Sequence, residues 1–246
     1  MFTDSQRFAS ANHQDDIAVL DVGDGENRFP LSSITAVERH LDEIQAGPSQ
    51  ALVTTAGGKF DTNALDIEWV VTHYVRMAWH VGRVQSLLTR ILTFPLPTVA
   101  AVSGHACGAG AMFAVAHDSR IMRSDRGYLC FPEVDFGLPF MPGTAALIRA
   151  KPDHRTAITA MTSGHRYGGT EARAHGLVDR TAPADGVLDT ALEVATPLLG
   201  KDPDTLGTIK ATIFASAVTA LGQLQGWTGS RHPARRRPLS MSALVA

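Results

Sequence analysis

The stretch "PTVAAVSGHACGAGAM" (residues 97–112) joins a short apolar run to a backbone that carries almost no large side chains. The run TVAAV is typical of a buried strand, and the glycines and alanines after it lead into a helical pattern. The start of a helix exposes backbone N–H groups, and the helix dipole favours negative charge there. The stretch therefore predicts either a cradle for an oxyanion or a close packing of helix on strand.

A second stretch, "TTAGGKFDTNALDIEWV" (residues 54–70), also runs from a strand through small residues into a helix, and offers a backbone N–H at Leu65. Two converging backbone donors are what an acyl or thioester carbonyl needs as it becomes an anion. The glycines around Ser103 fit neither the dinucleotide-binding nor the P-loop pattern, and they form no serine-hydrolase elbow. Nucleotide binding and serine hydrolysis are therefore excluded at the level of motifs.

Composition narrows the class of protein. The 246 residues are 44% hydrophobic and 19% charged, which is ordinary for one globular domain with a substantial core. The formal charge of −2 gives no footprint for nucleic acid, and the ten histidines form no HExxH-like metal cluster. Two cysteines in apolar stretches indicate packed, free thiols in a reducing compartment. With no secretory, membrane-spanning or peroxisomal signal, we expect a cytoplasmic protein without membrane or metal.

The order of the elements indicates an α/β protein that ends in helices. Strands are expected at 17–22, 51–56, 98–103 and 119–124. Helices are expected at 32–45, 66–94 with a break near Gly82, 111–118, 155–164, 168–176, 186–200 and 204–225. The arginine-rich segment 229–246 is predicted to be a flexible, solvated tail.

Four segments, in their order and spacing, resemble one known family. They are "GGKFDTNALDIEW" (57–69), "PTVAAVSGHACGAG" (97–110), "DRGYLCFPEVDFGLPFMPGTAAL" (125–147) and "MTSGHRYGGTEARAHGLVD" (161–179). The chain resembles the enoyl-CoA hydratase/isomerase (crotonase) superfamily, and most of all its plant-type Δ3,Δ2-enoyl-CoA isomerases. The resemblance implies a spiral of ββα units over 1–190, a helical C-terminal region over 191–228, and assembly as a homotrimer or a dimer of trimers.

The resemblance also implies roles for single residues. The two oxyanion-hole N–H groups fall on Leu65 and Ala109, and the principal catalytic carboxylate falls on Glu133. The chain carries alanine at Ala64 and Ala109, where the family usually has glycine, but alanine still supplies an N–H. Apolar neighbours of Glu133 are expected to raise its pKa toward the range of a general base.

Three positions that carry carboxylates in other branches of the family lack them here. The second glutamate of the hydratases corresponds to Met112, the aspartate of the dienoyl isomerases to Met141, and the aspartate nucleophile of the dehalogenases to Gly143. A single carboxylate suits an isomerase, which moves a proton without adding water. The resemblance thus implies isomerisation of 3-enoyl-CoA to 2-enoyl-CoA in fatty acid metabolism, with no cofactor beyond the coenzyme A of the substrate.

Two alternatives stay open: an enoyl-CoA hydratase that takes its second acid from elsewhere, and an acyl-CoA-binding member with weak catalysis. Candidate cations for the coenzyme A phosphates are Arg28, Lys59 and Lys210. His105 is expected to be structural, and Asn63 and Asp66 are expected to brace a helix that begins near Leu65. Asp135 shares a face with Glu133 if that segment is extended, and a structural role is expected for it.

Overall fold

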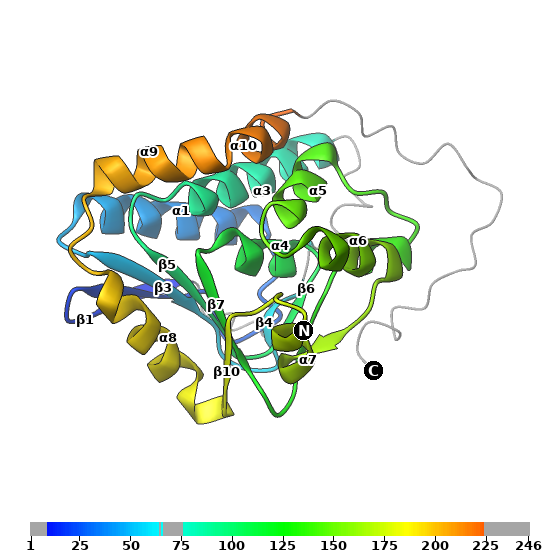
Figure 1. The fold of residues 1–246 in the computed structure, drawn as a ribbon. Helices are drawn as coiled ribbons and strands as arrows, with labels where there is room; N and C mark the ends of the chain where they lie inside the picture. The colour runs from blue at the N-terminus through cyan, green and yellow to red at the C-terminus, as the bar shows by residue number, and fades with distance from the viewer. Residues whose placement is uncertain (1–8, 64, 66–75, 224–246) are drawn as a thin grey trace, which may run out of the picture.

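The computed structural model describes residues 9–63, 65 and 76–223, and they form an α/β fold built around two sheets (Figure 1). The larger sheet, sheet A, has the strand order β1-β2-β3-β5-β7-β10. Its strands are β1 (Ser10–Gln14), β2 (Ile17–Asp21), β3 (Ala51–Thr55), β5 (Thr98–Val102), β7 (Ser119–Arg123) and β10 (Arg180–Ala182). All neighbours pair in parallel except β1 and β2, which are antiparallel.

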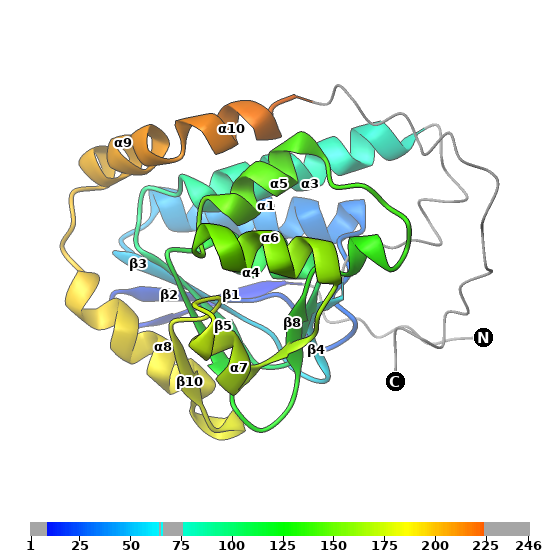
Figure 2. The same ribbon diagram turned by 45° about the vertical axis from the view of Figure 1, so that its right-hand side comes forward.

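Sheet A is covered on both faces, as parallel sheets require. Alternate side chains of each strand point to opposite faces, so Leu20, Leu52 and Ala100 belong to one core. That core also holds α1 (Leu31–Ala46), α3 (Met77–Leu92) and α4 (Ala109–Ala116). Val19, Val53 and Val99 face the other way, toward α8 (Val187–Ala195). Figure 2 shows α1, α3 and α4 above the sheet and α8 below it.

The smaller sheet, sheet B, has the order β4-β6-β8-β9. Its strands are β4 (Phe60–Asn63), β6 (His105–Cys107), β8 (Tyr128–Cys130) and β9 (Tyr167–Gly168). In the chain, β3, β5 and β7 of sheet A are each followed directly by one strand of sheet B. This repeated pair of strands is the ββα arrangement that the family resemblance implied. The residues alone predicted that small residues lead from the strands at 51–56 and 98–103 into helices. The short strands β4 and β6 lie there instead, so that part of the prediction is wrong.

The remaining helices are α5 (Pro142–Arg149), α6 (His154–Ser163), α7 (Gly169–Ala174), α9 (Pro203–Ile213) and α10 (Ala215–Leu221), with short 3-10 turns η2 (Pro132–Val134), η3 (Ala184–Gly186) and η4 (Thr196–Leu198). Of these helices, α7 packs on the strands, while α5, α6 and α10 pack on other helices and turns. Helix α3 runs through Gly82 without the expected break. The boundary expected at residue 190 falls inside α8, which packs on sheet A, and the segment 229–246 lies outside the described residues.

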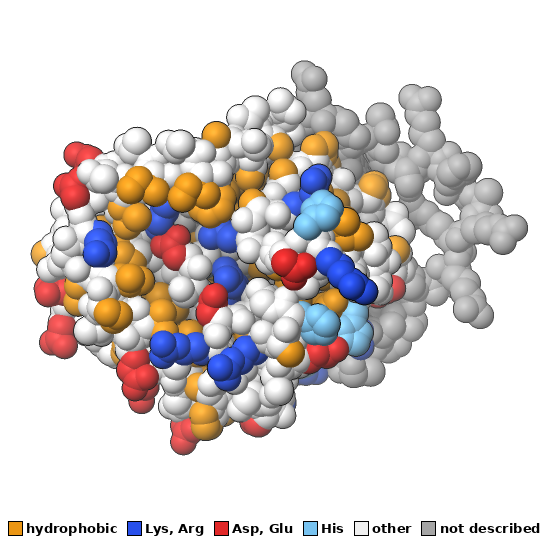
Figure 3. All heavy atoms as spheres, in the orientation of Figure 1, with side chains coloured by type: hydrophobic (Ala, Val, Ile, Leu, Met, Phe, Trp, Pro, Cys, Tyr) orange, Lys and Arg blue, Asp and Glu red, His pale blue; other side chains and the backbone are white. Residues whose placement is uncertain are grey.

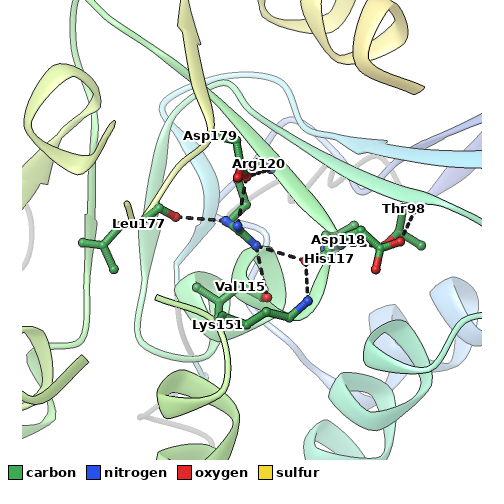
Figure 4. A network of polar contacts seen from close by, with 8 residues as sticks. All are labelled: Thr98, Val115, His117, Asp118, Arg120, Lys151, Leu177 and Asp179. Atoms are coloured by element: carbon green, nitrogen blue, oxygen red, sulfur yellow. Dashed lines mark hydrogen bonds and ion pairs between the residues drawn. The ribbon is translucent and has the colours of Figure 1, made fainter. Parts of the chain in front are cut away.

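The carboxyl end of α4 is held by cations (Figure 4). The carbonyl oxygen of His117 accepts hydrogen bonds from Arg120 Nη1 and Lys151 Nζ, each at 3.0 Å. Arg120 also donates to Leu177 O and forms an ion pair with Asp179. Positive charge at this end complements the helix dipole and satisfies carbonyls that have no partner within the helix. The contacts tie the end of α4 to the segment that follows α5 and to the segment that leads into β10.

Helix α9 is fastened by a buried lysine. Lys210 is 4% exposed, and its Nζ donates to Phe94 O, Leu96 O and Asp118 Oδ2. Burial lowers the pKa of Lys210, while the charge of Asp118 raises it. The prediction that Lys210 binds a coenzyme A phosphate is therefore wrong, because three protein oxygens already occupy its ammonium group.

Replacing this lysine tests its structural role. Lys210→Met should lower the free energy of unfolding by about 2–4 kcal/mol, because two buried carbonyls lose a donor and Asp118 loses its ion pair while it keeps the N–H of Thr98. The exposed Lys201 lies on the approach to the same helix, and Lys201→Met should change stability by less than about 0.5 kcal/mol. Urea unfolding of both variants makes the comparison. Equal stabilities would show that the Lys210 contacts contribute nothing.

Candidate active site

The carboxyl ends of three neighbouring parallel strands meet at one edge of sheet B. Asn63 of β4 pairs with Cys107 of β6, and Cys107 pairs with Cys130 of β8. Leu65 and Ala109 each follow their paired residue by two positions, and Glu133 follows Cys130 by three. The register therefore brings the three predicted site residues to the same edge. Ligands of α/β proteins commonly bind at the carboxyl ends of parallel strands.

Ala109 is the first residue of α4, and it is 7% exposed. Gly108 before it has a φ of 52°, which favours glycine. Its N–H donates to Cys130 O at 3.0 Å, and its carbonyl accepts from Met112 N at 2.9 Å. The turn is thus tied to β8 on one side and to the helix on the other. An N–H in the first turn of a helix has no acceptor within that helix, so the Ala109 N–H suits an oxyanion.

The small residues of the 97–112 stretch allow backbone to touch backbone. A Cβ added to Gly110 would lie 2.0 Å from Thr62 Oγ1 and 2.3 Å from Thr62 O. A Cβ on Gly104 would lie 2.4 Å from Lys59 O. The first turn of α4 therefore lies directly against β4, the strand that leads to Leu65. The close packing of helix on strand is therefore confirmed, and it brings the segments that lead to Leu65 and Ala109 together.

Glu133 lies in the 3-10 turn η2, which a proline opens. Phe131 and Pro132 before it are buried, and burial raises the pKa of Glu133 from 4.5 to about 7. Its Oε2 is buried and has no hydrogen-bond partner among the described residues. The upward shift of the pKa was predicted from the apolar neighbours, and it is confirmed. A carboxyl group with this pKa gains and loses its proton near neutral pH.

The three positions expected to lack a second carboxylate are occupied by packing residues. Met112 is 5% exposed within the main core, and Met141 is partly buried just before α5. A Cβ on Gly143 would lie 2.6 Å from the Cα of Leu221 in α10. An aspartate at residue 143 would therefore displace α10.

Asp135 does not share an extended face with Glu133, because the segment forms the turn η2. Gly164 lies so close to Asp135 that an added Cβ would be 2.6 Å from Oδ2. A face shared with Glu133 was expected only for an extended segment, and the segment is not extended.

His105 lies between two rings, with its centroid 5.4 Å from that of Phe60 and 4.1 Å from that of Tyr128. Burial and nearby cations lower its pKa, so the ring is neutral at pH 7. Packing of this kind agrees with the structural role expected for His105.

Asp61 in β4 is a buried acid that the sequence did not predict as part of the site. Burial raises the pKa of Asp61 to about 7, a hydrogen bond with the backbone of Ser103 lowers it, and the charge of Asp21 raises it. An isolated aspartate in a short strand gives no signal in a sequence. Asn63 ends β4, and the start of the helix that it was expected to brace (66–75, which includes Asp66) lies outside the described residues, as does Ala64.

Two candidate phosphate-binding cations flank β4. Arg28 Nε pairs with Glu26 Oε2 at 2.7 Å, and Glu26 O accepts the N–H of Asn63, two residues before Leu65. Lys59 is exposed at the opposite end of the strand, with its Nζ 5.4 Å from the ring centroid of Phe60. Arg28 therefore lies near the end of β4 that leads to Leu65, and Lys59 lies at the other end of the strand.

Cys107 and Cys130 are free and buried, as the sequence predicted. Across the described ranges, no three His, Cys, Asp or Glu side chains gather in a way that could hold a metal ion. No helix within those ranges is long and apolar enough to cross a membrane.

Comparison with known proteins identifies the fold and the family. The profile described as enoyl-CoA hydratase/isomerase matches residues 26–225. The chain belongs to this family. Enoyl-CoA delta isomerase 3 of Arabidopsis thaliana is 34% identical over 203 residues, which cover 78% of this chain and 85% of the relative. A putative enoyl-CoA hydratase of Thermus thermophilus is 32% identical over 206 residues, or 81% of each chain.

A solved structure carries the same fold. The crystal structure of human mitochondrial delta3-delta2-enoyl-CoA isomerase aligns with a TM-score of 0.79 at 22% identity. The alignment covers 87% of this chain and 86% of the human one. The crotonase-type fold of this family member is thereby confirmed.

The contact between Gly110 and Thr62 can be tested by adding a single methyl group. Gly110→Ala should destabilise the fold by about 1–3 kcal/mol or more, because the new Cβ overlaps backbone atoms of β4. Gly168 has a φ of −65° and nothing within 4 Å of an added Cβ, so Gly168→Ala serves as the control. Equal urea midpoints for the two variants would show that α4 does not lie against β4.

Proposed function

We propose that the protein isomerises 3-enoyl-CoA to 2-enoyl-CoA by moving one proton with one carboxylate. The observation that carries the proposal is Glu133, a half-buried residue whose buried Oε2 has no hydrogen-bond partner among the described residues, at the end of sheet B where Leu65 and Ala109 also lie. The Arabidopsis relative is named as an enoyl-CoA delta isomerase, which agrees with this reaction.

The proposed reaction has two proton transfers. Glu133 takes a proton from C2 of the 3-enoyl thioester, and the electrons move to the thioester oxygen as an enolate. The backbone N–H groups of Leu65 and Ala109 hold that oxygen. Glu133 then returns the proton at C4, and the double bond ends between C2 and C3. A pKa of about 7 suits both transfers, because the group is close to half-ionised at neutral pH.

The substrate is proposed to be a coenzyme A thioester from fatty acid metabolism, with no other cofactor. Arg28 is the stronger candidate for a phosphate contact because its loop is bonded to the strand that leads to Leu65. Lys59 is a second candidate, at the far end of β4. A cytoplasmic location remains a prediction from the sequence.

A homotrimer, or a dimer of trimers, is proposed as the assembly. Hydrophobic side chains gather on the face where α8 and α9 lie (Figure 3). On α9, Ile209 is 48% exposed and Ile213 is 66% exposed. These two side chains lie one helical turn apart and form an apolar stripe that another copy of the chain would cover.

The alternatives differ from the isomerase in what they require. A hydratase needs a group that orients water, and Met112 stands at the position implied for it. A weakly catalytic acyl-CoA binder would follow if the alanine at residue 109 spoiled the oxyanion cradle. The turn at Gly108 and the N–H of Ala109 favour a working cradle.

Removing the carboxylate tests the proposal. Glu133→Gln should bind acyl-CoA and lose at least about 10²-fold in kcat, the usual contribution of a general base. In the wild type, kcat/KM should fall about tenfold per pH unit below about 7, because a protonated Glu133 cannot accept a proton. Asp61 also has a pKa of about 7, so the pH dependence could come from either acid. If it comes from Glu133, the residual activity of Glu133→Gln should no longer fall below pH 7.

A stability measurement checks the same pKa without turnover. The native pKa of Glu133 lies above its ordinary 4.5, so its ionisation destabilises the fold as pH rises from 4.5 to about 7. Glu133→Gln should therefore be the more stable protein at pH 8, with the difference shrinking toward pH 4.

In the kinetic experiment, wild-type turnover by Glu133→Gln would show that Glu133 does not take part in the reaction.

Met112→Glu distinguishes isomerase from hydratase. The wild type should isomerise 3-enoyl-CoA and hydrate crotonyl-CoA very slowly or not at all. Met112→Glu places a second carboxylate in the first turn of α4, where the helix dipole partly offsets its charge, and should gain measurable hydration. Met112→Gln is the matched control without the charge. Rapid hydration by the unmodified protein would favour the hydratase.

A further inference from the structure

β4, the strand that leads to Leu65, is the outermost strand on one side of sheet B. β4 pairs only with β6 in the strand order of the described sheet, and the register shifts between Phe60 and Thr62. The outward backbone groups of an edge strand need partners from outside the sheet. Four residues with one regular neighbour give β4 little rigidity of its own.

Residues 22–28, which we call the edge strap, supply those partners. At one end of the strap, Val22 N donates to Thr55 O and Gly57 N donates to Gly23 O. At the other end, Asn63 N donates to Glu26 O at 2.9 Å. The strap therefore runs along the turn before β4 and reaches the strand's last residue.

Asn27 closes the strap onto the strand. Its Nδ2 lies 3.1 Å from each of three carbonyl oxygens, those of Gly23, Phe60 and Asp61. The first bond ties the strap to itself, and the other two tie it to consecutive residues of β4 at the register shift. The side chain is 9% exposed, and its φ of 48° is one that asparagine adopts more readily than most residues.

We propose that Asn27 is a positioning residue, which holds the Leu65 donor and the Arg28 guanidinium in one fixed frame through the edge strap. Arg28 follows Asn27 directly, and Leu65 follows the strapped Asn63 by two residues. An oxyanion donor must be placed accurately, because a misplacement of about 1 Å can cost about 10²-fold in rate. The inference rests on the proposed isomerase function for its effect on turnover, but not for the contacts themselves.

Two substitutions remove the amide donor in different ways. Asn27→Asp keeps the size and the tolerance of positive φ, but turns a carboxylate oxygen toward three carbonyls. Asn27→Gly keeps the backbone conformation and adds no charge. Both should lower kcat/KM for 3-enoyl-CoA by about 10²-fold, with kcat falling at least tenfold and KM rising. The pH at which kcat/KM turns over should stay that of the wild type, because the hydrogen bonds of Asn27 within the described residues go to Gly23, Phe60 and Asp61 and not to Glu133.

The matched control is Asp202→Ala. Asp202 caps α9 by accepting the N–H of Thr205, so its loss lowers stability without reaching sheet B. It should leave kcat and KM unchanged at a similar loss in melting temperature. The positioning role is overturned if the Asn27 variants lose no more kcat/KM than Asp202→Ala does at an equal loss in melting temperature.

Hydrogen exchange reads the strap directly and separates the two proposals. In the wild type, the Asn63 and Gly57 amides should be protected together, and both Asn27 variants should lose protection at Asn63 first. Loss of that protection supports the strap even if the wild type shows no turnover, which would reject the isomerase alone. Unchanged protection at Asn63 would overturn the strap. Should neither variant fold, an unprotected Asn63 amide in the wild type would overturn it equally.

Discussion

The parallel register of β4, β6 and β8 is the constraint on which the site depends. Asn63, Cys107 and Cys130 stand side by side, and the chain leaves each of them by a short turn of two or three residues. A slip of one residue in either pairing would turn the site residues to the opposite face. Three very short strands cannot fix such a register by their own hydrogen bonds. Contacts of Gly104, Gly110 and Asn27 with the segment 59–62 also hold the register in place.

Helix α4 links this edge to the rest of the protein through its two unlike ends. Its carboxyl end receives Arg120 and Lys151, and its amino end lies open at the carboxyl edge of sheet B. Cations at one end and an open amide at the other follow the direction of the helix dipole. Glu133 lies at the same end of sheet B, and burial raises its pKa to about 7. The electrostatics of the site are therefore set by burial and by backbone more than by neighbouring charged side chains.

The sequence predicted sheet A better than sheet B, for a physical reason. The strands of sheet A are apolar runs such as Ile17–Asp21 and Thr98–Val102, which period and composition reveal. Strands such as His105–Cys107 are too short for alternation to show, and glycines on both sides give them the look of a turn. Glu133 could be assigned only through the family resemblance, since a glutamate after a proline usually lies on a surface. Lys210 was misread because its partners Phe94 and Leu96 lie more than a hundred residues earlier, where no local pattern reveals them.

The separation of the site into three turns bears on how such enzymes diversify. The three site residues stand on three different turns, so a side chain can change on one turn without replacing the backbone amide that another turn supplies. In the proposed mechanism, the backbone donors for the thioester carbonyl are then kept, whatever acid or base the third turn or the first turn of α4 presents. The same independence makes this edge a suitable starting point for engineering new acyl-CoA chemistry.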